Sequence, residues 1–88
     1  MKRVHLHVSG RVQGVFFRAE CERMARARSL GGFVRNMPDG RVEAAFEGDD
    51  ADVDAAVVWC RQGPPWAAVD SVEATAEQLT GEREFRVR

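Results

Sequence analysis

The stretch GRVQGVFFR, residues 10–18, joins an alternating apolar pattern to a helical one and carries more than a plain turn needs. The first backbone N–H groups of a helix have no partner within the helix. Gly10 and Gly14 allow the backbone between them to curl and to direct its amides toward one point. Because the helix dipole also attracts negative charge, the stretch predicts a site for a phosphate group.

Arg18 strengthens this prediction. A cation in the first turn of a helix opposes the helix dipole, which favours an anion held beside it. The alternative is a surface arginine paired with Glu22 one turn later, an interaction of only about 0.2–0.5 kcal/mol. The stretch lacks the Gly-Lys-Ser/Thr ending of a nucleoside-triphosphate loop and the glycine spacing of a dinucleotide site, so neither ATP nor NAD is indicated.

Asn36 is the second candidate, because asparagine is disfavoured in strands and the turn that follows has its own turn-forming residues. Its carboxamide offers both a hydrogen-bond donor and an acceptor. An asparagine at an edge, bonded to water or backbone, explains the residue equally well when it is considered alone. Both interpretations therefore remain open.

Other polar groups are assigned no chemistry. His5 and His7 alternate with apolar residues, and we expect them to face solvent, since two imidazoles without further ligands make a poor metal or catalytic site. An acidic run fits the start of a helix better than a metal site: Asp49, Asp50, Asp52 and Asp54. We expect no metal and no cofactor.

The hydrophobic periodicity predicts seven elements. These are a strand at 4–9, a helix from Phe17 to about Ser29, a hairpin of 33–37 and 41–47 around Pro38-Asp39-Gly40, a helix after Asp49-Asp50 that closes at 61–65, and strands at 69–76 and 85–87. An α+β ferredoxin-like sandwich (split βαβ), an antiparallel sheet with two helices on one face, buries all the apolar stripes at once.

The sequence also predicts how the two phenylalanines and the hairpin strands pack. Phe16 and Phe17 are expected to anchor the loop and the helix start in the core. In the strand at 33–37 apolar residues occupy both parities, so its inward face is undecided. The next strand is clearer, with Val42 and the residues at 44 and 46 on one face.

The composition describes one small domain, residues 1–88, with 44% hydrophobic and 31% charged residues and a net charge of −1. This balance argues against nucleic acid or an anionic membrane as partner. No apolar run could cross a bilayer and no signal-peptide pattern opens the chain, so we expect a cytoplasmic protein. We also expect a monomer. Cys21 and Cys60 fall in helical registers and are expected to be free thiols.

The chain resembles the acylphosphatase family. The motifs that carry the resemblance are, in order, GRVQGVFFR, GGFVRN, PDGRVE, FEG and a closing FRVR. The resemblance implies the ferredoxin-like fold and hydrolysis of small acyl phosphates to carboxylate and inorganic phosphate. It implies that Arg18 is the catalytic phosphate-binding arginine and that Asn36 holds the attacking water. The implied phosphate cradle is formed by loop amides: Arg11, Val12, Gln13, Gly14 and Val15.

The chain departs from the family pattern at two positions. Phe33 stands where tryptophan is common, and Ser29 stands where a helix-ending glycine is usual. Two other functions were weighed. An RNA-recognition module shares the order of elements, but the outward positions lack aromatic platforms. A domain of a larger hydrogenase-maturation protein is disfavoured because no second domain accompanies this one.

Overall fold

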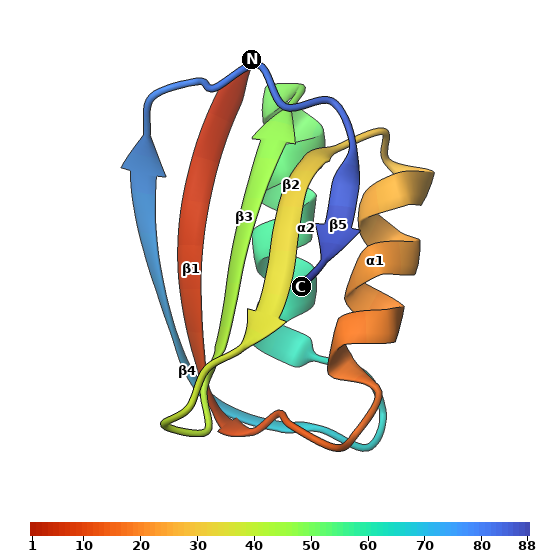
Figure 1. The fold of residues 1–88 in the computed structure, drawn as a ribbon, viewed down its shortest axis with the longest axis vertical. Helices are drawn as coiled ribbons and strands as arrows, with labels where there is room; N and C mark the ends of the chain where they lie inside the picture. The colour runs from red at the N-terminus through yellow and green to blue at the C-terminus, as the bar shows by residue number, and fades with distance from the viewer.

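Seven elements follow one another in the predicted order in the computed structural model, which describes residues 1–88. They are β1 (Lys2–Arg11), α1 (Phe17–Ala27), β2 (Gly31–Asn36), β3 (Val42–Gly48), α2 (Asp50–Gln62), β4 (Ala68–Glu77) and β5 (Phe85–Val87). Both helices lie against one face of a five-stranded sheet, and the other face carries no helix (Figure 1). The α+β ferredoxin-like sandwich is confirmed.

The sheet has the order β4-β1-β3-β2-β5. The expectation of an antiparallel sheet is wrong for one pairing, because β5 runs parallel to β2. The reason is topological. The chain leaves β4 at one edge, crosses the end of the sheet and returns along the opposite edge, so β5 runs against β4 and therefore with β2 (Figure 1).

The core lies between the sheet and the helices, and it confirms the predicted periodicities. Leu6 and Val8 of β1 are fully buried, as are Cys21 of α1 and Cys60 of α2. Burying each large apolar side chain stabilises the fold by about 1.5–3 kcal/mol. Both cysteines are free thiols, as expected. A hydrogen bond with Cys60, together with burial, raises the pKa of the Cys21 thiol.

Helix α1 ends at Ala27, two residues before the predicted end. Ser29 then adopts a left-handed conformation with φ of 57°, and the amide of Leu30 donates to the carbonyl of Ala25 over 2.9 Å. This is the helix ending for which glycine is the usual residue. Ser29 therefore adopts the left-handed conformation that glycine usually takes at this position, at a cost of about 1–2 kcal/mol.

In the β2–β3 hairpin, the structure shows which face of β2 is buried, which the sequence pattern leaves undecided. Val34 is fully buried in the core, whereas Phe33 points to the open face, where the guanidinium of Arg88 lies 4.0 Å from its ring centroid. Asn36 follows Val34 by two residues, so it shares the face that is covered by the helices. The predicted turn is present, with Gly40 at φ of 94°.

A buried ion pair closes the end of the sheet opposite this hairpin. Arg3 and Glu47 are 5% and 2% exposed, with 3.1 Å between Nη1 and Oε1. The Glu47 carboxylate also accepts hydrogen bonds from the amides of Thr80 and Gly81, at 2.9 and 2.7 Å. Burial works to raise the pKa of Glu47, but these hydrogen bonds outweigh it, and the pKa is lowered.

Replacing Glu47 with glutamine is expected to lower the free energy of unfolding at neutral pH by about 3 kcal/mol or more, because Arg3 would lose its buried partner. The carboxylate contributes fully above its ordinary pKa of 4.5, and the contribution is lost as the pH falls through the lower folded-state value. Urea unfolding at neutral and acidic pH should therefore show the parent and variant converging in acid. Glu84→Gln, at a side chain 82% exposed, is the control and should change little.

Candidate active site

The loop between β1 and α1 is shaped by two glycines. At Gly10, with φ of 124°, the pairing of β1 with β4 shifts register, and an added Cβ would lie 2.2 Å from the carbonyl oxygen of Ala68. Gly14 takes the left-handed conformation at φ of 73°. From Val12 to Phe16 no amide donates a hydrogen bond to a backbone carbonyl. These donors are therefore free to bind an anion.

Two side chains hold the loop against its neighbours. The Gln13 side-chain amide donates to the carbonyls of Met37 and Arg41 over 2.8 and 2.9 Å, which ties the loop to the β2–β3 hairpin. The Arg11 guanidinium donates to the carbonyl of Trp66 over 3.2 Å. These contacts fix the loop beside the end of β2, where Asn36 lies.

The two phenylalanines have different environments. Phe17 is 1% exposed and packs edge-on against Trp59 at 5.3 Å between ring centroids, as expected. The same expectation is wrong for Phe16, which is 68% exposed. Phe16 precedes α1 in a left-handed conformation at φ of 63°, and its ring meets Trp66 edge-on at 6.0 Å. The sharp entry into the helix turns one ring inward and the other toward solvent.

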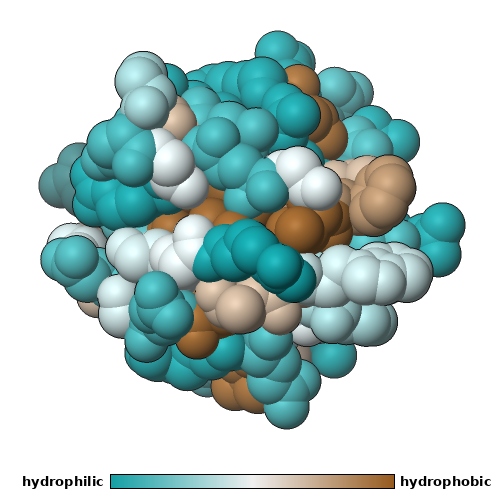
Figure 2. Space-filling model, turned by 90° about the horizontal axis from the view of Figure 1, so that it is seen from below, coloured by the Kyte–Doolittle hydropathy of each residue, from teal (hydrophilic) through white to brown (hydrophobic).

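A pocket of about 520 Å³ lies where this loop, the start of α1 and the ends of β2 and β5 meet. Its lining includes Val12, Gly14, Phe16, Arg18, Asn36 and Val87. Figure 2 shows this end of the molecule, with apolar surface recessed between hydrophilic side chains. The pocket thus combines apolar walls with one guanidinium, one carboxamide and the carboxylate of Glu22.

Arg18 reaches the pocket from the exposed side of the first turn of α1. Its nearest polar contact is long, 3.4 Å from Nη1 to the carbonyl oxygen of Arg88. The alternative pairing with Glu22 is not what the structure shows, because Glu22 is paired with Arg26 at 3.1 Å. The planar guanidinium fork therefore has donors to offer to an oxyanion.

Asn36 enters the same pocket from the last residue of β2. Its Oδ1 atom is buried and has no hydrogen-bond partner. An unpaired buried acceptor costs about 1–3 kcal/mol, so it is rarely retained without a reason. This observation disfavours the alternative of an edge asparagine bonded to backbone.

The predicted site residues thus fall into two groups. Arg18 and Asn36 line one pocket with Val12 and Gly14. Three other loop residues do not line it with their side chains: Arg11, Gln13 and Val15. Phe16 and Val87 line the pocket and were not predicted to do so. No sequence signal points to Val87, because its position follows from the pairing of β5 with β2.

The acidic run at the start of α2 is occupied by cations of the chain itself. Asp50 lies 3.0 Å from the terminal amine of Met1, and Asp52 lies 3.0 Å from Arg28. Asp49 precedes α2 without a capping hydrogen bond from its side chain.

Neither helix of the structure has both the length and the apolar character needed to span a bilayer.

Comparison with known proteins places these features in a family. The model of the acylphosphatase family matches residues 4–87. The acylphosphatase of Syntrophus aciditrophicus is 51% identical over 88 residues, covering 99% of this chain and 92% of that protein. The acylphosphatase of Methylococcus capsulatus is 53% identical, covering 99% and 96%. The crystal structure of acylphosphatase from Bacillus subtilis superposes with a TM-score of 0.96 at 35% identity, covering 100% of this chain and 99% of that one.

Proposed function

Because this chain belongs to the acylphosphatase family, we propose that Arg18 and Asn36 carry its reaction in the pocket at the start of α1. The chain is an acylphosphatase, an enzyme that hydrolyses the carboxyl-phosphate bond of acyl phosphates. The products are a carboxylate and inorganic phosphate. The proposal concerns which residues do this and how.

The chemistry of an acyl phosphate reduces the number of catalytic groups that the enzyme needs. The leaving group is a carboxylate, which departs without a general acid because carboxylic acids are ionised at neutral pH. What remains is to neutralise the phosphoryl oxygens and to place a water in line with the bond that breaks. Phosphoryl transfer is catalysed mainly in these two ways, by electrostatics and by positioning.

The first task falls to Arg18 and to the backbone. Its fork binds two phosphoryl oxygens, and the unpaired loop amides from Val12 to Val15 bind the others, while Arg11 borders the cradle at the end of β1. The second task falls to Asn36, whose carboxamide orients the attacking water. The observation that carries the proposal is the unpaired, buried Oδ1 of Asn36 in the pocket that Arg18 also lines.

Titration of ¹⁵N-labelled protein with inorganic phosphate tests the cradle. We expect the largest shifts of amide signals at Val12 and Gly14 and at the start of α1. A second hollow lined by Arg83, Arg86 and Arg88 is the internal control for unspecific attraction of anions. Shifts confined to that hollow would contradict the proposal.

We also propose that residues 1–88 act as one domain, as a monomer and in the cytoplasm. A single core of 15 buried residues supports the first statement. The free thiols of Cys21 and Cys60 fit a reducing compartment. Sedimentation equilibrium at the concentration used for assay would test the second, since a dimer would double the measured mass.

A further inference from the structure

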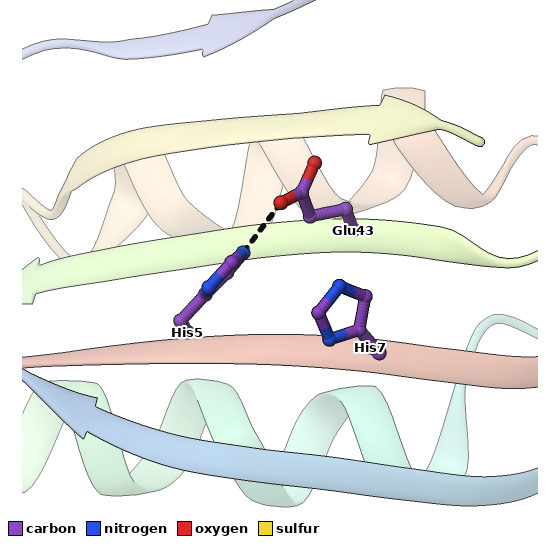
Figure 3. Close-up of side chains that lie close together, drawn as sticks. All are labelled: His5, His7 and Glu43. Carbon is purple, nitrogen blue, oxygen red and sulfur yellow. Dashed lines mark hydrogen bonds and ion pairs between the residues drawn. The ribbon is translucent and has the colours of Figure 1, made fainter.

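The open face of the sheet carries a cluster that the hydrolytic reaction does not use. His5 and His7 project from β1, and Glu43 projects beside them from β3 (Figure 3). The chain contains two histidines, and both belong to this cluster. Asn36 faces the helices, so the cluster and the pocket lie on opposite faces of the sheet.

The strand register places a carboxylate beside the two histidines, which the sequence pattern alone does not reveal. His7 is paired directly with Glu43 on β3 and with Glu73 on β4. One imidazole-nitrogen or carboxylate-oxygen atom from each of His5, His7 and Glu43 lies within 4.8 Å of the others. The His5 and Glu43 side chains are only 24% and 12% exposed, so both are held by their surroundings. A carboxylate therefore accompanies the two imidazoles, which the sequence pattern did not indicate.

Both ring nitrogens of His5 lie close to carboxylates. Nδ1 lies 2.8 Å from Oε1 of Glu77. Nε2 faces Oε2 of Glu43 at 2.6 Å, a hydrogen bond in the tautomer that carries the proton on Nε2. In the tautomer with the proton on Nδ1, the Nε2 lone pair and Oε2 of Glu43 face one another and can both bind a cation.

Carboxylate and guanidinium groups surround the cluster. A histidine that binds a metal commonly donates its other N–H to a carboxylate, and Oε1 of Glu77 lies 2.8 Å from Nδ1 of His5. Arg35 pairs with Oε1 of Glu43, which leaves Oε2 directed at His5. Charges of both signs flank the cluster: Glu77 and Glu73 lie on β4, Arg35 lies on β2, and Arg3 of β1 donates to Glu77 over 3.1 Å.

We propose that His5, His7 and Glu43 form a binding site for a divalent transition-metal ion of the zinc type on the open face of the sheet. Two imidazole nitrogens and one carboxylate oxygen are ligands that Zn²⁺ prefers, at about 2.0–2.2 Å. To admit the ion, Nε2 of His5 and Oε2 of Glu43 move apart by less than about 1 Å, to the spacing of adjacent ligands in a tetrahedron. Three protein ligands leave a fourth position open.

Titration with ZnCl₂ of protein that carries no polyhistidine tag tests this site. The side-chain ¹⁵N signals of His5 and His7 are expected to shift together and to saturate at one ion per chain. Co²⁺ in place of Zn²⁺ is expected to give the visible absorption of a four- or five-coordinate ion. His7→Asn and Glu43→Gln should each weaken Zn²⁺ binding by at least about tenfold, which is the lower end of the loss when a metal site loses even a supporting partner.

Two controls separate this site from the pocket. Arg18→Ala should bind Zn²⁺ like the parent, whereas His7→Asn should hydrolyse acyl phosphate like the parent. The proposal is wrong if the imidazole signals stay unchanged at millimolar Zn²⁺, which would leave the hydrogen bond between His5 and Glu43 as the whole content of the cluster. It is also wrong if His7→Asn and Glu43→Gln bind as tightly as the parent, or if Arg18→Ala abolishes binding.

Discussion

Arg18→Ala is expected to lower kcat/KM for benzoyl phosphate by at least about 10²–10³, the loss typical of one preorganised transition-state donor. The side chain is exposed and makes one long contact, so the substitution should leave the fold intact. Phosphate release, measured on protein whose circular dichroism matches the parent, gives the answer. Parent-like hydrolysis by folded Arg18→Ala protein would disprove the assignment.

Two further variants show whether the effect comes from the guanidinium itself. Arg18→Lys keeps the charge but loses the planar fork, and we expect it to stay close to the alanine variant. Arg23→Ala removes another exposed arginine of α1, outside the pocket, and should hydrolyse benzoyl phosphate at the parent rate. A lysine variant with full activity would mean that charge alone is sufficient.

Asn36→Ala is expected to lower kcat by about 10²–10³ through loss of the group that orients the water. The expected effect on stability has the opposite sense. The parent buries an unpaired Oδ1, at a cost of about 1–3 kcal/mol, and alanine removes it. The free energy of unfolding should therefore be unchanged or higher in the variant, while its activity falls.

This combination distinguishes a functional group from a structural one. If Asn36 served the fold, its removal would lower stability and activity together. Asn36→Asp provides a matched variant of nearly the same shape, and its negative charge beside the phosphoryl group should also suppress hydrolysis. Urea unfolding and phosphate release on the same samples give both quantities. Full activity in the alanine variant would exclude Asn36 from the reaction.

Much of this molecule is predictable because its signals are local. The period of two in β1, the period of three to four in α1 and the turn at Gly40 each depend on neighbours in sequence. The placement of Arg18 against the helix dipole is also local, and it indicates an anion site at the start of α1. Helix and strand types were therefore right, and their ends differed by a few residues.

The features that escaped prediction depend on contacts between distant segments. The parallel direction of β5 follows from a crossing over the end of the sheet, and it brings Val87 to the pocket. The outward ring of Phe16 follows from the entry angle of α1. Glu43 meets His7 only through the register of β1 and β3, which no periodicity reveals.

The contact between Arg18 and the carbonyl oxygen of Arg88 has a practical consequence for protein engineering. A segment fused after Arg88 starts beside the carbonyl oxygen that lies 3.4 Å from Nη1 of Arg18, so it can crowd the pocket mouth. Met1 lies at the far end of the sheet from the loop between β1 and α1 (Figure 1). Purification handles, dyes and surface linkers therefore belong on the amino-terminal side of this enzyme.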